Sequence, residues 1–338
     1  MGALTDIFNQ DAFSTVTMTE AVNVIPNNYG RIRQSGIFKE KGITTTSVAI
    51  ERMNNVLNLL PQTQRGGEAS RNNSGKRQVI SIEIPNFTHE DTIKAADVLN
   101  VRAFNTDNQL QAIQDLVLMK LAEMRSKHDI TLEFMCAGAL KGKVLNSEGD
   151  VIVDLFKAFG IQQKTIDFKF SKTGTEVDAL CRDVHRHIEK NLKGEMMTSI
   201  LGLCSPEYFD RLLADPSVKE AYNNYQAKTP WRDDMRQEFV YQGVKFSEYV
   251  GEATNVKGEV FKFVPEGEAV FLPLGTTNTF EINNAPGDYI DAVGTLGLPI
   301  YAKQEVSKFE RGVDLQTQSN PLPICKRPEV LVKGTSSN

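Results

Sequence analysis

The feature that most restricts the fold is a long helical pattern over residues 107–137, which no proline interrupts. Polar residues at 105–107 are candidates for the N-cap, and Gly138 is a candidate stop. About 30 residues at about 1.5 Å each would extend about 45 Å, which is typical of a spine across a domain or of a bundle helix. Apolar residues and one histidine recur along it at spacings of three and four: Leu110, Ile113, Val117, Leu121, Met124, His128 and Met135.

A second pattern predicts a long β-hairpin, with strands over 44–60 and 77–84 and a connection over 61–77. The connection is rich in Gly, Asn and Ser and almost lacks apolar side chains, so we expect it to project from the body of the protein. It carries four basic residues against one acidic residue, Glu68. An isolated two-stranded ribbon is marginal in water, and a neighbouring copy of the chain is one partner that could stabilise it.

Residues 1–40 have only scattered apolar positions, so they could not form a core alone. Two interpretations stay open. The segment is either an irregular subdomain packed on its own chain or an arm packed on neighbouring subunits.

The rest of the chain mixes helices and strands. The pattern predicts a hairpin over 143–155, a helix over 176–192 and two short helices within 205–225, which are separated near Asp215-Pro216. From residue 237 onward, strands and turns dominate. This order indicates an α+β fold with two interlocked subdomains.

Composition argues against several kinds of partner. The 338 residues carry a formal net charge of −5, whereas tight nucleic-acid binding needs a basic face. No apolar run approaches the roughly 20 residues of a membrane span, and the N-terminus lacks a secretory pattern. The four cysteines are far apart, so we expect buried free thiols in a reducing cytoplasm.

The search for chemistry finds no phosphate-binding loop, nucleophile elbow, HExxH or GxGxxG motif. Cys181, His185 and Glu189 would share one helix face, but His187 lies about 200° from His185, so a shared metal ion is disfavoured. A Cys181–His185 nucleophile is also disfavoured, because Cys181 should face the core. His128 should be packed in its helix. We expect no catalytic residue, metal or cofactor.

Three segments of the C-terminal third carry a resemblance to a known family. They are EFVYQGVKFSEYVG at 238–251, APGDYIDAVGTLGLPIYAK at 285–303 and QSNPLPICKRPEVLV at 318–332. Each resembles a motif of the lambda-type major capsid proteins of tailed bacteriophages, the phage capsid protein E family. Shorter matches in the N-terminal half, including Gly36-Ile37-Phe38 and Leu60-Pro61, follow in the same order. The resemblance therefore covers nearly the whole chain, with 140–235 the least aligned part.

The resemblance implies the HK97-like phage capsid fold, which is α+β. Its parts would be an N-terminal arm (1–40), an extended loop (41–87) and a peripheral domain (88–170) with the spine helix 107–137. An axial domain (171–325), with strands returning to the peripheral domain, and a C-terminal strand and tail (326–338) would follow. In this family the extended loop lies on an adjacent subunit, which makes six residues candidate intersubunit contacts: Arg65, Gly66, Gly67, Arg71, Lys76 and Arg77.

The function implied is a major capsid protein that self-assembles into the hexamers and pentamers of an icosahedral head. Its partners would be further copies of itself, a scaffolding protein, a portal and a candidate decoration protein, and it would face packaged double-stranded DNA without specificity and no membrane. We expect it in the host cytoplasm during assembly and then in the virion capsid. Two alternatives stay open: a cytoplasmic α+β enzyme with an unrecognised site, and a cargo-enclosing shell of the same fold.

Overall fold

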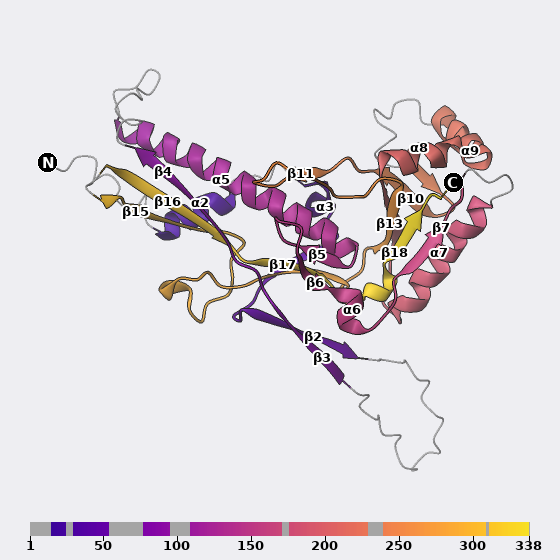
Figure 1. The fold of residues 1–338 in the computed structure, drawn as a ribbon, viewed down its shortest axis with the longest axis horizontal. Helices are drawn as coiled ribbons and strands as arrows, with labels where there is room; N and C mark the ends of the chain where they lie inside the picture. The colour runs from indigo at the N-terminus through magenta and orange to yellow at the C-terminus, as the bar shows by residue number, and fades with distance from the viewer. Residues whose placement is uncertain are drawn as a thin grey trace, which may run out of the picture. The chain divides into compact units, whose positions relative to one another are not determined.

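The computed structural model describes residues 15–24, 30–53, 77–94, 109–170, 176–228, 239–308 and 311–337 (Figure 1). The chain divides into two compact units. Unit 1 comprises residues 1–48, 83–133 and 282–323, and unit 2 comprises 49–82, 134–281 and 324–338. No helix in the described ranges is both long and apolar enough to cross a membrane.

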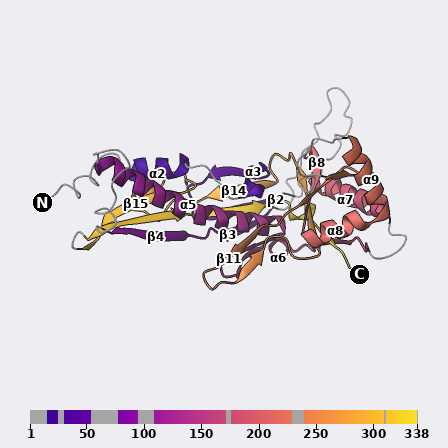
Figure 2. The same cartoon turned by 90° about the horizontal axis from the view of Figure 1, so that it is seen from above.

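Unit 1 is built on a three-stranded antiparallel sheet of order β15-β16-β4. Helix α2 and the first part of α5 cover one face of this sheet (Figure 2). Ten buried side chains form the core between them, among them Met18 and Val22 of α2 and Leu121 and Met124 of α5. The elements are α2 (Thr15–Val24), α3 (Arg31–Gln34), β1 (Lys39–Gly42), β4 (Phe87–Lys94), α5 (Gln109–Leu140), η2 (Ile290–Ala292), β15 (Tyr301–Val306) and β16 (Gly312–Ser319).

Unit 2 contains a six-stranded mixed sheet of order β7-β18-β13-β8-β10-β9. Its strands are β7 (Lys164–Asp167), β8 (Ser199–Cys204), β9 (Phe239–Tyr241), β10 (Val244–Glu248), β13 (Glu268–Leu274) and β18 (Val332–Thr335). Its helices are α6 (Leu155–Phe159), α7 (Val177–Leu192), α8 (Pro206–Ala214), α9 (Pro216–Lys228) and η4 (Pro328–Val330). Two small ladders pair β5 (Lys143–Leu145) with β6 (Val151–Asp154) and β11 (Glu252–Thr254) with β12 (Val260–Lys262).

Several elements are continuous through the boundary between the units. They are α5 itself, β2 (Ser47–Met53), β3 (Arg77–Glu83), β14 (Phe280–Asn284) and β17 (Pro321–Cys325). Strands β14 and β17 join β1 in a sheet of order β1-β14-β17, and β2 pairs with β3.

Most predicted elements are confirmed, and the end of the spine helix is corrected. The helix continues to Leu140 instead of stopping before Gly138. A Cβ at position 138 would lie 2.6 Å from the carbonyl oxygen of Lys143. Gly138 therefore permits the chain of β5 to approach the helix, and it does not end the helix. The hairpin within 143–155, the helix α7 and the break at Asp215 between α8 and α9 all lie where the sequence predicts them.

Candidate intersubunit contact site

The six predicted contact residues belong to the connection between β2 and β3. Five of them, at positions 65–67, 71 and 76, lie outside the described residues, and Arg77 is described only as the first residue of β3. Their role as intersubunit contacts stays a prediction. What the structure describes is the stem from which this connection leaves.

The stem is a pair of strands with one buried face. Ile50 of β2 and Ile82 of β3 are buried, whereas Ser81 and Glu83 are exposed. At its base the amide of Ile84 donates to the carbonyl oxygen of Thr46 at 3.0 Å. The predicted alternation is therefore confirmed for the described part of the hairpin. Burial of the isoleucines fixes the register, because a slip of one residue would turn them outward.

A second site joins the N-terminal segment to the spine helix within unit 1. The Glu133 carboxylate of α5 is buried, and its two oxygens accept hydrogen bonds from the amides of Ile32 at 2.7 Å and Arg33 at 3.2 Å. These amides lie in the first turn of α3, where backbone donors have no partner inside the helix. Glu133 thus satisfies the start of α3 as a capping side chain would, although it is a hundred residues away in sequence.

Gly30 makes this approach possible. It precedes α3 with a φ of +106°, a conformation that favours glycine. A Cβ at position 30 would lie 2.5 Å from Oε2 of Glu133. Any larger residue would therefore push the carboxylate off the amides that it binds.

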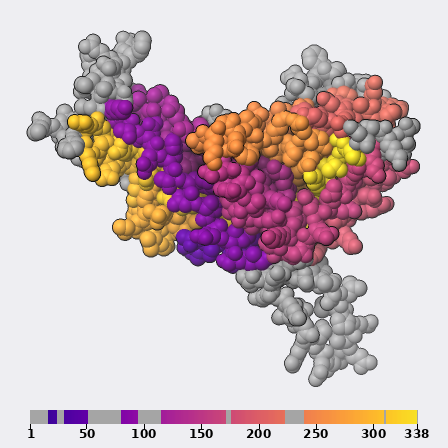
Figure 3. Space-filling view, viewed as in Figure 1, coloured from indigo at the N-terminus to yellow at the C-terminus, as the bar shows by residue number. Residues whose placement is uncertain are grey.

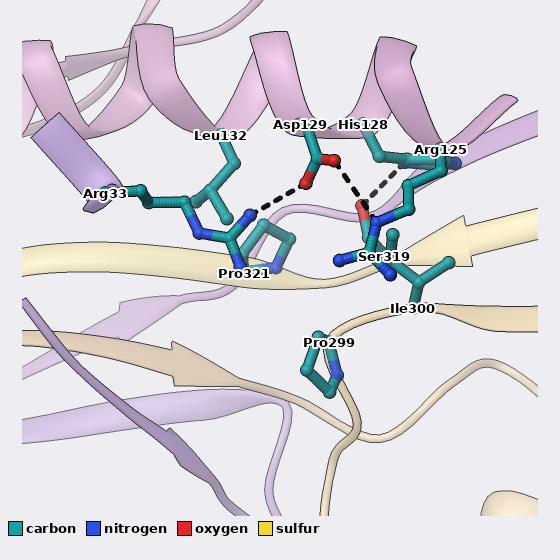
Figure 4. A pocket seen from close by; sticks show the side chains of 9 residues that line it. All are labelled: Arg33, Arg125, His128, Asp129, Leu132, Pro299, Ile300, Ser319 and Pro321. Carbon is teal, nitrogen blue, oxygen red and sulfur yellow. Dashed lines mark hydrogen bonds and ion pairs between the residues drawn. The ribbon is translucent and has the colours of Figure 1, made fainter. Parts of the chain in front are cut away.

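Charged side chains extend the site along α5 (Figure 4). The Arg33 guanidinium contacts Asp129 at 2.7 Å and Glu40 at 2.8 Å, and Arg125 contacts Asp129 at 3.3 Å. Arg125 also donates to the carbonyl oxygen of Val22, close to the end of α2. Arg125, Asp129 and Glu133 are buried, so each charge depends on its partners in place of water.

The middle and the C-terminal end of α2 are attached to the start of strand β15 and to the residue before it. The Thr19 hydroxyl exchanges hydrogen bonds with the backbone of Ala302, at 3.2 Å to the oxygen and 3.1 Å from the amide. Asn23 donates to the carbonyl oxygen of Ile300 at 2.9 Å. Residues 15–24 and 30–40 therefore make these contacts within their own chain, and the packing of an N-terminal arm on neighbouring subunits stays a prediction.

His128 completes the buried polar face of α5. Its two ring nitrogens lie 2.8 Å from the Ser319 hydroxyl and 2.9 Å from the Thr317 hydroxyl, both on β16. Burial, and secondarily the charge of His89, lowers the pKa of His128 to about 4, so the ring is neutral near pH 7. The expectation of a packed histidine is confirmed, and we find it hydrogen-bonded on both sides.

The residues weighed for chemistry do not converge. His187 lies 3.0 Å from the carbonyl oxygen of Glu329, whereas His185 lies 3.4 Å from that of Gly243. Cys181 is buried, and burial raises the pKa of its thiol to about 12, so the nucleophilic thiolate is strongly disfavoured. Within the described residues, no three His, Cys, Asp or Glu side chains lie close enough to hold a metal ion.

Sequence reasoning missed the charged site, although a signal was present. Arg125, Asp129 and Glu133 recur at a spacing of four, next to the predicted apolar positions of the helix. Charges that continue an apolar stripe indicate a buried ionic face. Their partners, the amides of α3 and Arg33, could not be found from sequence because no spacing rule connects them to α5.

Comparisons with known proteins agree on one family. The family described as phage major capsid protein E matches residues 14–336. The chain is 28% identical to the major capsid protein of Salmonella phage Felix O1 over 350 residues, covering 95% of each chain. It is also 28% identical to the major capsid protein of Pseudomonas phage KPP10 over 345 residues, covering 97% of this chain and 98% of that protein.

Solved structures show the same fold. A capsid protein of a prophage from E. coli CFT073 aligns with a TM-score of 0.58 at 15% identity, over 96% of this chain and 99% of that one. The mature capsid of bacteriophage PhiM1 aligns with a TM-score of 0.51 at 13% identity, over 93% and 88%. The expected HK97-like α+β fold is confirmed, and nothing in these comparisons supports the enzyme alternative.

Proposed function

Because the chain belongs to the phage major capsid protein E family, we propose that its copies assemble into the hexamers and pentamers of an icosahedral head that encloses double-stranded DNA. The protein is a structural subunit of the virion capsid and not an enzyme. The observation that carries the proposal is the family match over residues 14–336, supported by relatives aligned over nearly their full length.

The finer assignments belong to the same proposal. We assign residues 1–40 to an arm, 41–87 to an extended loop, 88–170 to a peripheral domain, 171–325 to a mainly axial domain and 326–338 to a C-terminal strand. Scaffolding protein, portal and decoration protein are the proposed partners, and assembly is proposed to occur in the host cytoplasm.

The extended loop is proposed to bind an adjacent subunit through Arg65, Gly66, Gly67, Arg71, Lys76 and Arg77. Glycines permit close backbone approach, and arginines pair well with carboxylates of a neighbour. The net charge of −5 supports an inner wall that faces DNA without gripping it.

Electron microscopy of the expressed protein tests the main proposal. Closed particles or ring-shaped capsomers are expected, whereas a monomer that persists at high concentration would contradict it. Nucleic acid packaged in heads from infected cells distinguishes a genome-enclosing head from a cargo-enclosing shell.

The loop assignment has its own test. Deletion of residues 62–76 should leave a folded, soluble subunit that no longer assembles. The double substitution Arg65→Gln and Arg71→Gln should weaken assembly more than the control pair Lys157→Gln and Lys219→Gln, which removes the same charge from exposed positions of unit 2. Equal assembly of both double variants would contradict the assignment.

A further inference from the structure

The connection between β14 and β15 presents an unusual number of apolar side chains to solvent. Within residues 287–299, here called the apolar loop, Ile290 is 96% exposed, Val293 78%, Leu296 64% and Leu298 41%. The segment leaves the strands as a loop with one helical turn, η2 (Figure 1), and the region lies at the molecular surface (Figure 3). Single exposed apolar residues are normal, but a cluster of this kind is typical of a surface that binds another protein.

The apolar loop is attached to the rest of unit 1 by hydrogen bonds at both ends of its base. The amide of Gly297 donates to the carbonyl oxygen of Ile43 at 2.9 Å, and that of Leu298 donates to the Tyr301 hydroxyl at 2.9 Å. The amide of Asp288 donates to the Gln318 side chain at 3.1 Å. A Cβ at position 297 would lie 2.1 Å from the carbonyl oxygen of Asn284, so the loop packs directly on the end of β14.

This attachment bears on the affinity that the loop could have for a partner. A loop that is already ordered loses little conformational entropy when a partner covers it, so its exposed apolar area contributes more fully to affinity. None of these four side chains belongs to the core cluster of unit 1 between α2, α5 and the sheet.

The charged residues around the apolar loop indicate which class of partner could bind it. Asp291 forms an ion pair with Lys303 at 2.8 Å, and the Lys303 ammonium lies 4.2 Å from the centre of the Tyr289 ring. The Asp291 charge is thus compensated within unit 1. Asp288 is exposed and adds a second acid to the loop. The loop therefore offers little to DNA or to another anionic partner, whereas its apolar side chains can pack against another capsid subunit.

We propose that the apolar loop docks on a second copy of this chain in the assembled shell. This inference rests on the proposed function, which places further copies of the chain around every subunit. Closed symmetric assemblies bury the same patch on every copy, so one small apolar surface is covered many times over. Ile290 and Val293, the two most exposed side chains, would supply most of the contact.

Assembly of charged variants tests the proposal. The double substitution Ile290→Glu and Val293→Glu should leave the melting temperature of the subunit unchanged, and it should raise the protein concentration needed for assembly by about tenfold or more. The control is Val256→Glu with Val260→Glu, on valines that are 104% and 54% exposed; Val256 lies in the turn between β11 and β12, and Val260 is the first residue of β12. Equal loss of assembly in both variants would overturn the proposal, because added charge alone would explain it.

Cysteine labelling gives a direct readout that needs no assembly defect. All four native cysteines are buried, so Val293→Cys adds one accessible thiol, and Val256→Cys serves as its reference. In particles of this chain alone, maleimide should react with Cys at 293 about tenfold more slowly than in the unassembled subunit, relative to Cys at 256. Unchanged reactivity, or protection only in heads that contain other phage proteins, would overturn the inference. Wild-type chain that forms no particles would instead contradict the proposed function.

Discussion

In unit 1 the long helix carries buried charges beside its apolar core, whereas in unit 2 packed aromatic rings hold the sheet. Asp129 and Glu133 are as deeply buried as the apolar residues around them, at 3% and 2% exposure. In unit 2 the rings of Phe168 and Phe271 stack at 5.6 Å, and Phe246 meets Phe271 edge-on at 5.9 Å.

In both units, glycines leave room for the side chain at the centre of the packing. Phe271 of β13 fits because both flanking strands carry glycine beside it. A Cβ at Gly202 of β8 would lie 2.8 Å from the ring, and one at Gly334 of β18 would lie 2.6 Å from it. In unit 1, Gly30 makes the corresponding room for the Glu133 carboxylate.

The difference teaches which part of the subunit is sensitive to geometry and pH. Apolar packing stabilises in proportion to buried area and tolerates small shifts. A buried ionic network stabilises only while every partner is in place, and it is costly when one partner is removed. The attachment of the N-terminal segment should therefore be the more specific and the more easily disturbed of the two.

The largest effect is expected from Phe271→Ala. Removing the ring leaves a cavity between β8 and β18, and this should lower the free energy of unfolding by about 3–5 kcal/mol. Hydrogen exchange should speed up in the β8 and β13 amides of unit 2. Phe271→Leu serves as the control and should cost less than half as much. If the amides of α2 and α3 lost protection equally, the separation of the two cores would be wrong.

A smaller loss is expected from Glu133→Gln. The amide side chain keeps one acceptor but turns a donor toward a backbone amide, which should cost about 2–3 kcal/mol. The loss should appear in hydrogen exchange as opening of α3. Glu123→Gln, on an exposed position of the same helix, should change stability by no more than about 0.5 kcal/mol. A Glu133 variant as stable as the Glu123 variant would show that the buried network contributes nothing.

The elements that the sequence predicts correctly are those with a local pattern. Local periodicity is enough for α5, for the isoleucine alternation of β2 and β3, and for α7, because each pattern is contained in one element. The apolar stripe of α5 also places Leu121 and Met124 in the core correctly.

The remainder depends on pairs that are distant in sequence. Glu133 binds amides a hundred residues away, and Asn23 binds a carbonyl at position 300. The sheet of unit 2 also places β8 between β10 and β13, in an order that no local pattern encodes. The role of the six loop residues stays a prediction, because it concerns contacts with a neighbouring subunit.

The third effect concerns pH and should be confined to unit 1. The pKa of His128 is lowered to about 4 in the folded state, against about 6.5 in the unfolded chain. At pH values between these two pKa values, His128 is protonated in the unfolded chain and neutral in the folded chain. The stability contributed by neutral His128 is complete above pH 6.5 and is lost as pH falls toward 4, by at most about 1.4 kcal/mol per pH unit.

Urea unfolding at several pH values measures this slope, and His128→Gln should flatten it. His89→Gln is the matched control, since the pKa of His89 is also lowered but the side chain is more exposed. If the dependence of stability on pH persisted in His128→Gln and disappeared in His89→Gln, the effect would belong to His89 and the prediction would be wrong.

The smallest effect should be the same in both units, because it involves ion pairs at the surface. Lys120 contacts Asp91 at 3.0 Å in unit 1, and Lys143 contacts Asp154 at 3.4 Å in unit 2. Water screens both pairs, so Lys120→Gln and Lys143→Gln should each cost about 0.2–1 kcal/mol in urea unfolding, and less in high salt. Equally small losses of unfolding free energy in the two variants would mean that the burial of charges, and not their number, accounts for the difference between the units. If Lys120→Gln cost as much as Glu133→Gln, the contrast between buried and exposed charge in unit 1 would fail.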